Sequence, residues 1–266
     1  MTVEVLPERQ ASVPRRRAGN VGLSLLSRYW TVLALLVAWQ LFSSLSGLNR
    51  IVVPSPGTVF GDVAWNVGAY LPDLAWTLGM AAAGLLVGMA TGTALAVAVW
   101  SSRVVSGMMT PVALIMRSVP VVAMIPVLAR VFGYGWTTVL VITSVVSFFP
   151  AFVLVGARLR DAPRAALDLM AVLGASRPTV LRRLLLPHAV PGLLVAFRLT
   201  ASTAVLGAML AEYLMGGRGL GTLFAQSVSF YQVDRAWGTA LVATVVSVAS
   251  FVAARAVERW GTARFT

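Results

Sequence analysis

The sequence predicts an all-α protein that crosses a membrane several times. Of its 266 residues, 58% are hydrophobic and only 11% are charged. A soluble domain of this length needs a larger share of charged surface, so the composition places the chain in a lipid bilayer. Apolar runs of membrane-spanning length recur along the chain, and most of the basic residues gather at the ends of these runs.

Six apolar runs are candidates for the spans. A helix needs about 20 apolar residues to cross roughly 30 Å of hydrocarbon. The expected spans are residues 29–45, 74–100, 104–132, 137–157, 189–215 and 237–257. We expect residues 1–28 to form a disordered, basic cytosolic tail and residues 29–266 to form the transmembrane domain.

The loop between the first two runs has a pattern of its own. Residues 53–57, Val-Pro-Ser-Pro-Gly, predict a turn. In residues 58–70, three valines recur at helical spacing. This spacing suits a short interfacial helix, and an ordinary connecting loop fits the segment equally well.

The arginines predict the orientation. Fifteen of them lie in the N-terminal tail, in the loops after the second and fourth runs, and in the C-terminal end, whereas only Arg50, Arg218 and Arg235 lie in the opposite loops. Arginine-rich loops stay on the cytosolic side of a membrane. Both termini and residues 158–183 are therefore expected in the cytosol.

The composition excludes several kinds of chemistry. The chain has no cysteine and one histidine, His188, which excludes disulfides and a histidine-rich metal site. All 21 basic residues are arginine, so the lysine of a phosphate-binding P-loop is missing. We therefore expect no catalytic residue, no bound metal and no cofactor in this chain.

A basic amphipathic segment lies between the fourth and fifth runs. Gly174 is placed to end a first helix in a left-handed turn, and Ser176 and Pro178 can begin a second helix. The pattern predicts a helix–turn–helix beneath the membrane, although an amphipathic helix resting on anionic lipid also fits. Six arginines belong to the segment: Arg158, Arg160, Arg164, Arg177, Arg182 and Arg183.

This segment resembles the EAA loop of ABC importer permeases, written E-A-A-x3-G-x9-I-x-L-P. Asp168-Leu169-Met170, then Gly174, then Leu184-x-Leu186-Pro187 match its spacing throughout, with Asp in place of Glu and Leu-Met in place of Ala-Ala. Further motifs similar to those of nitrate/sulfonate/taurine/bicarbonate-type permeases follow in the expected order. They are Pro54-Ser55-Pro56, Arg117-Ser118-Val119-Pro120-x-x-Ala123-x-x-Pro126, Phe132-Gly133-x-Gly135, Phe148-Phe149-Pro150, Arg198, Glu212 and Gly219-Leu220-Gly221.

The resemblance implies the transmembrane subunit of an importer, working as a homodimer in a bacterial plasma membrane. Two cytosolic ATPase subunits would bind ATP and magnesium, and an external solute-binding protein would deliver a small solute such as nitrate, a sulfonate, taurine or a vitamin precursor. A coupling loop, about residues 158–188, would contact the ATPase. Its implied contact residues are Asp168, Leu169, Met170, Gly174, Ala175, Arg182, Leu186 and Pro187.

The expected third span contains three prolines, Pro111, Pro120 and Pro126. Proline removes a backbone donor and kinks a helix, and the freed carbonyls are tolerated in a membrane only beside protein or a water-filled cavity. The span is therefore a candidate for lining the solute path, with a packed kink as the alternative. The candidate path residues are Arg117, Pro120, Met124, Pro126 and Glu212.

Two of these candidates carry charge. Arg117 and Glu212 would each cost about 2.5 to 3.5 kcal/mol at the centre of a bilayer, so each should face protein or water. Arg117 fits either a path residue that attracts an anion or a structural ion pair with Glu212, and the ion pair is slightly favoured.

Two other classes of membrane protein fit part of the pattern. A secondary transporter would need buried acids and internal repeats, whereas Glu212 is the one plausible acid and no repeat is evident. A non-transporting anchor subunit would not need a kinked third span. Gly84, Gly88 and Gly92 recur every four residues in the second run and predict close helix packing, within one subunit or between two.

Overall fold

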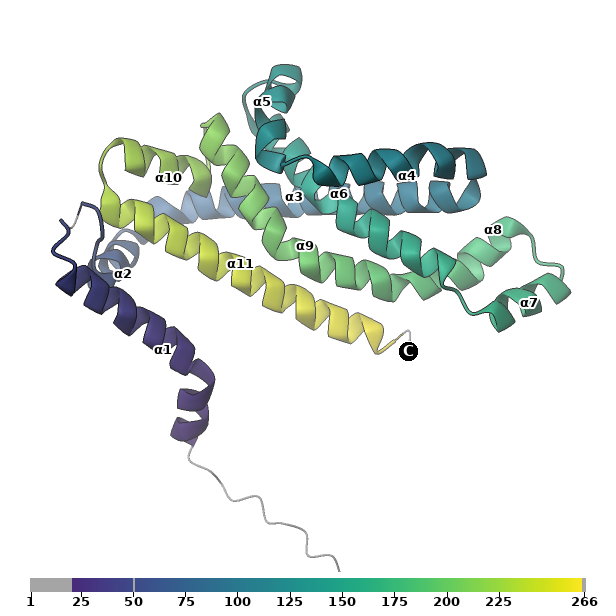
Figure 1. Ribbon diagram of the computed structural model, residues 1–266, viewed down its shortest axis with the longest axis horizontal. Coiled ribbons are helices and arrows are strands. Elements are labelled where there is room, and N and C mark those ends of the chain that lie inside the picture. Colours follow the sequence, from purple (N-terminus) through teal and green to yellow (C-terminus); the bar gives the residue numbers. More distant parts are fainter. Residues whose placement is uncertain (1–20, 50, 265–266) are drawn as a thin grey trace, which may run out of the picture. The chain divides into compact units, whose positions relative to one another are not determined.

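The computed structural model describes residues 21–49 and 51–264, and within them every regular element is a helix (Figure 1). The all-α prediction is confirmed. The elements are α1 (Val21–Leu45), α2 (Pro56–Trp65), α3 (Val67–Ser101), α4 (Arg103–Ser118), α5 (Val121–Phe132), α6 (Trp136–Arg160), α7 (Arg164–Val172), α8 (Arg177–Val180), the π-helical turn η1 (Leu181–Leu185), α9 (Leu186–Met215), α10 (Leu220–Ser229) and α11 (Val233–Thr262).

The chain forms two compact units, Met1–Pro56 and Gly57–Thr266. In the first unit, α1 is followed by a turn at residues 51–53, earlier in the chain than the turn predicted at residues 53–57, because Pro56 and Gly57 already begin α2. The segment after this turn folds back onto α1. The indole N–H of Trp39 donates to the carbonyl of Pro54 at 3.1 Å, and Ser43 donates to the carbonyl of Val53 at 3.4 Å. Of the predicted N-terminal tail, residues 1–20 lie outside the described residues, and α1 begins at Val21.

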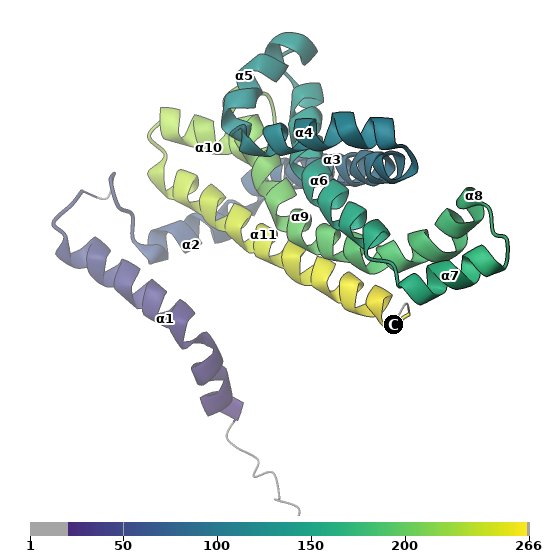
Figure 2. The same cartoon turned by 45° about the vertical axis from the view of Figure 1, so that its right-hand side comes forward.

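Four helices of the second unit are long and apolar enough to cross a membrane: Val67–Ser101, Trp136–Arg160, Arg177–Met215 and Val233–Thr262. They pack against one another, with α3 on α6, α6 on α9, and α9 on α11. We call the end that carries α7, α8 and the last turn of α11 the hairpin end. Figures 1 and 2 show α2 and α10 at the opposite end.

The glycines of α3 allow this packing. A Cβ atom added at Gly84, Gly88 or Gly92 would lie under 3.0 Å from an atom of α6, in Thr143, Ser144 and Phe148 respectively. Small residues at every fourth position let two helix backbones approach closely. The prediction of close packing is confirmed, and the contact lies within one subunit.

The predicted third span is wrong as a single helix. It is divided into α4 and α5, and Pro120 lies between them in an extended conformation with φ −60° and ψ 127°. Proline also holds the residue before it out of the helical region, which explains why the break falls at Val119–Pro120. Pro111 and Pro126, in contrast, lie inside α4 and α5.

The lengths of the other predicted elements also change. The predicted second span begins at Val67 rather than Leu74, because Pro72 is accommodated in the first turns of α3. Of the two alternatives left open for residues 58–70, the structure shows a short helix, α2, but it begins at Pro56 and ends at Trp65, and Val67 belongs to α3. Among the described residues, Trp30–Leu45 and α5 are apolar but shorter than the four candidate spans.

Candidate functional site

The predicted helix–turn–helix is formed by α7 and α8, and we call residues 164–187 the hairpin. Helix α7 ends at Val172, and the turn after it contains Gly174, whose φ of +65° is in the left-handed region. The N–H of Ala175 donates to the carbonyl of Met170, and the N–H of Gly174 donates to the carbonyl of Ala171, both at 3.0 Å. These two bonds make a Schellman motif, so the predicted role of Gly174 is confirmed.

The second half of the hairpin continues directly into the fifth span. Helix α8, η1 and α9 form one helical stretch, Arg177–Met215. The N–H of Leu186 donates to the carbonyl of Leu181, one residue further back than in an α-helix. The following residue, Pro187, has no N–H and its ring crowds the preceding turn, which accounts for the widened π turn at this point.

An unpartnered apolar stripe follows the outer side of α7. Leu169, Val172 and Leu173 are 60%, 85% and 70% exposed. They are spaced three and four residues apart and therefore share one helical face. Leu167, on another face, packs against the apolar cluster that includes Leu159 and Leu185. Helix α7 is thus attached to the molecule on one side and presents free apolar surface on the other.

The structure brings the predicted contact residues together at the hairpin end. Asp168 and Arg182 are exposed, Met170 and Ala175 are half-buried, and Leu186 and Pro187 are half-buried at the start of α9. Leu185 is buried and Leu181 and Leu184 are half-buried, whereas Arg182 and Arg183 are exposed.

Four of the five candidate path residues lie on the divided third span, and the fifth, Glu212, lies on α9. Pro120 and Pro126 are exposed and Met124 is half-buried. Helix α5 packs against α6 and α9 through Ile125 and Ala129, and its other face is open. Arg117 belongs to α4, but its side chain lies outside the described residues, so its predicted roles stay predictions.

Glu212 lies at the centre of a buried polar node at the opposite end. Its side chain is fully buried, and its Oε2 atom accepts hydrogen bonds from Thr77 Oγ1 at 2.8 Å and from the N–H of Gly221 at 3.1 Å. The N–H of Leu220 donates to Thr77 Oγ1 at 2.8 Å. A carboxylate at the first turn of α10 is stabilised by the partial positive charge at the N-terminus of that helix.

Two glycines permit this node. A Cβ atom at Gly219, where φ is +110°, would collide with the Glu212 carboxylate, and a Cβ atom at Gly221 would collide with the backbone carbonyl of Met209. The N–H of Gly219 donates to Asp73 of α3 at 3.0 Å. Glu212 thus joins α9, α3 and α10, and this geometry supports a structural role.

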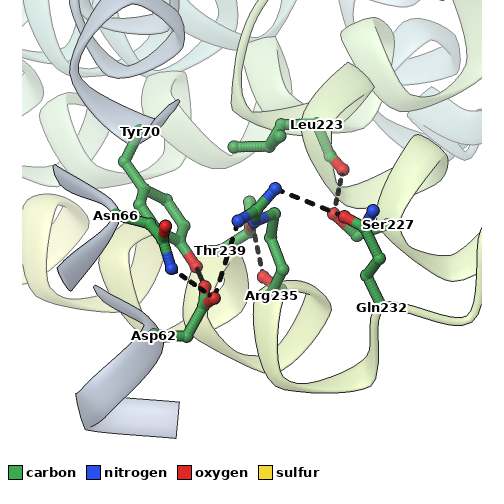
Figure 3. Close-up of polar contacts among 8 residues, drawn as sticks. All are labelled: Asp62, Asn66, Tyr70, Leu223, Ser227, Gln232, Arg235 and Thr239. Atoms are coloured by element: carbon green, nitrogen blue, oxygen red, sulfur yellow. Dashed lines mark hydrogen bonds and ion pairs between the residues drawn. The ribbon is translucent and has the colours of Figure 1, made fainter. Parts of the chain in front are cut away.

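A second polar cluster joins α2, α3 and α11 at the same end (Figure 3). Asp62 accepts hydrogen bonds from Asn66, at 2.8 Å, and from the hydroxyl of Tyr70. Arg235 lies 3.6 Å from Asp62 and donates to Gln232 at 3.4 Å. The cluster fixes the start of α11 against α2 and α3.

Comparisons with known proteins agree with this architecture. Residues 74–263 match the family described as "Binding-protein-dependent transport system inner membrane component". The chain belongs to this family. One relative is a "Probable ABC transporter permease protein" of Haemophilus influenzae, with 29% identity over 85% of this chain and 92% of the relative. Another is the riboflavin transport system permease protein RibX of Chloroflexus aurantiacus, with 27% identity over 86% of each chain. A third is the taurine transport system permease protein TauC of Escherichia coli, with 24% identity over 86% of each chain.

Solved structures of ABC importers share the fold of the permease. An inward-facing MetNI methionine ABC transporter has a TM-score of 0.60 at 22% identity and covers 70% of this chain and 92% of that chain. A bacterial ABC transporter involved in the import of the acidic polysaccharide alginate has a TM-score of 0.62 at 17% identity and covers 89% and 98%. The chain is therefore a multi-pass permease subunit of an ABC importer for a small solute.

The sequence did not reveal the partners of the permease's buried charges. Thr77 and Asp73 carried no motif, and the Gly219-Leu220-Gly221 motif gave the one hint of a tight approach in this region. Arg198, known only as a motif residue, lies 2.9 Å from Glu258 and so ties α9 to α11. Charges inside a membrane protein need such partners, but their identity depends on the fold.

Proposed function

We propose that the hairpin is the surface through which a partner ATPase drives this permease. The exposed stripe of Leu169, Val172 and Leu173 is the observation that supports the proposal most strongly. Apolar helix faces left open in a monomer mark contact sites. The stripe stands at the end of the molecule that the arginine distribution assigns to the cytosol, where an ATPase has access to its nucleotide.

Movement of the hairpin would reach the membrane through one rigid element. Helix α8 is continuous with α9, which in turn packs on α3, α6 and α11. ATP binding would close two ATPase subunits, move the two hairpins of a permease homodimer, and turn the spans so that the path opens outward. Hydrolysis would return the path inward, and the permease itself would make and break no bond.

The path itself is assigned to the divided third span. Helix α5 is open on the side that carries Pro126, and Val122, Val127 and Val131 on it are 51%, 64% and 70% exposed. A second copy of the chain would face this surface, with the solute passing between the copies. A small polar or anionic solute is favoured, because relatives are named for riboflavin, formylaminopyrimidine and taurine transport.

The proposal further places the permease in a bacterial plasma membrane with both termini cytosolic, and an external solute-binding protein would choose the solute. The test is copurification of the permease with its coexpressed ATPase, together with solute uptake in proteoliposomes. Gly174→Pro is the informative variant, because proline cannot adopt a φ of +65° and has no N–H for the bond to Ala171.

Gly133→Pro is the matched control. Gly133 also has a left-handed φ, of +86°, and its N–H donates to Ala129 at the end of α5, far along the chain from the hairpin. We expect Gly174→Pro to lose the ATPase and Gly133→Pro to retain it. Equal retention by both variants, or uptake that follows a proton gradient and ignores ATP, contradicts the proposal.

A further inference from the structure

A pocket of about 970 Å³ lies at the hairpin end, between the last turn of α3 and the second half of the hairpin. Trp100 and Arg103 line it from one side, and Arg177, Val180 and Leu181 line it from the other. Its location separates it from the exposed stripe of α7, which does not contribute to the lining. The pocket and the stripe are therefore different surfaces of the hairpin, although Ala175, an implied contact residue for the ATPase, also lines the pocket.

The pocket is apolar at its base and cationic at its rim. Trp100, Val180 and Leu181 are half-buried and pack against the apolar cluster that contains Phe152 and Leu185. Arg103 and Arg177 are both exposed. Neither arginine forms an ion pair with an acidic residue in the part of the chain that the structure describes. Two guanidinium groups are thus available to an anionic ligand.

We propose that this pocket binds the headgroup of an anionic phospholipid, with the phosphate between Arg103 and Arg177 and the glycerol and upper acyl chain against Trp100, Val180 and Leu181. Guanidinium groups bind phosphate with charge-assisted hydrogen bonds, which are stronger than neutral ones. The apolar base of the pocket can contact the hydrocarbon part of an amphipathic ligand, whereas a free phosphate ion has no apolar part to place there.

The position of the pocket at the end of a candidate span favours lipid over a protein partner. Trp100 lies in the last turn of α3, next to Ser101, where the span ends and α4 begins with Arg103. Indole side chains at span ends lie at the level of the lipid headgroups. A ligand that contacts both this turn and the hairpin would tie the moving element to the membrane surface. The proposal takes from the proposed function only the cytosolic placement of this end, where anionic lipids attract basic residues.

Binding of phosphatidylglycerol and phosphatidylcholine to the purified full-length permease, measured by native mass spectrometry, tests the proposal without ATP or any partner. We expect the Arg103→Gln/Arg177→Gln variant to bind phosphatidylglycerol about 10- to 30-fold more weakly than the unaltered chain, because two arginine–phosphate contacts are lost. The matched control is Arg182→Gln/Arg183→Gln, which removes the same charge from two exposed hairpin residues outside the pocket. This control should bind within about threefold of the unaltered chain.

A double Arg103→Lys/Arg177→Lys variant should retain most of the binding, since each charge is kept, and it reports on lipid even if the glutamine variant fails to insert. Equal weakening by both glutamine variants would show that the lipid follows net charge and would overturn the proposal. So would phosphatidylcholine binding as tightly as phosphatidylglycerol, or displacement by millimolar inorganic phosphate. A pocket variant that keeps its lipid but loses the coexpressed ATPase would assign the pocket to the ATPase instead. Because lipid binding is measured on the permease alone, this result does not depend on whether the hairpin contacts an ATPase.

Discussion

The permease ends two of its helices in the same way at opposite ends of the molecule, but with different residues. At the hairpin, Gly174 takes the left-handed position after α7, with φ +65°. After α10, Tyr231 takes it, with φ +57°. The N–H of Gln232 donates to Ser227 at 2.8 Å and the N–H of Tyr231 donates to Val228 at 3.2 Å, which repeats the bonding pattern at Gly174. Left-handed geometry costs a non-glycine residue roughly 1–2 kcal/mol.

The difference reflects what surrounds each turn. No residue of α7 is buried, so the hairpin turn depends on glycine and on its own hydrogen bonds. The turn at Tyr231 is followed directly by Gln232 and Arg235, which belong to the polar cluster around Asp62. Contacts from other helices thus hold a conformation that the local sequence disfavours. The conformation of the turn at Gly174 is thus determined by its local sequence, and the conformation of the turn at Tyr231 is determined by tertiary contacts.

The largest predicted effect tests the tertiary end. Gly221→Ala should destabilise the permease by about 3 kcal/mol or more, because the new Cβ would collide with the backbone of Met209 and cannot be relieved by a side-chain movement. The measurement is the yield of folded protein and its thermal unfolding midpoint in detergent. Gly61→Ala, in open space on α2, is the control and should be near neutral.

The next effect concerns the carboxylate itself. Glu212→Ala leaves the Thr77 hydroxyl and the Gly221 N–H without their acceptor, and each unsatisfied buried group costs about 1–3 kcal/mol. We expect a lower unfolding midpoint for Glu212→Ala and a smaller loss for Glu212→Gln, which keeps one acceptor oxygen. If both variants unfold like the unaltered chain and only transport falls, Glu212 acts in the solute path and not as a structural node.

The contacts of Glu212 show which parts of the structure the sequence could not predict. The turn at Gly174, the helix that follows it and the hairpin spacing were predictable, because they depend on residues close together in the chain. The Thr77–Glu212 hydrogen bond joins residues 135 positions apart, and no local pattern indicates it. The same reasoning applies to the third span. Three prolines predicted a disturbance, but Pro120 divides the helix while Pro111 and Pro126 lie inside α4 and α5, so the prolines alone did not indicate where the break falls.

A smaller effect on stability, with a larger one on coupling, is expected at the hairpin. Gly174→Ala has open space for its Cβ, so the cost is the roughly 1–2 kcal/mol of left-handed geometry alone. The loss should show as reduced uptake per ATP hydrolysed, while the unfolding midpoint of the membrane domain changes little. A variant that unfolds like Gly221→Ala would show that the hairpin is not the locally determined element described above.

The smallest effect has the opposite sign. Tyr231→Gly relieves the left-handed strain and removes a side chain that is 82% exposed, but glycine loses about 0.5–1 kcal/mol more backbone entropy on folding. A net stabilisation of up to about 1 kcal/mol is expected, seen as a slightly higher unfolding midpoint. A clear decrease would mean that the Tyr231 side chain has stabilising contacts of its own.

The central claim is that the stripe on α7 contacts a cytosolic ATPase. The chain has no cysteine, so a single introduced cysteine reports one position. We would place one at Val172, 85% exposed on the stripe, and a control at Tyr231, and apply a bifunctional crosslinker to membranes containing the coexpressed ATPase. We expect an adduct with the ATPase from Val172→Cys and none from Tyr231→Cys. An ATPase adduct from Tyr231→Cys alone, or labelling of Val172→Cys in intact cells by a membrane-impermeant maleimide, would contradict it.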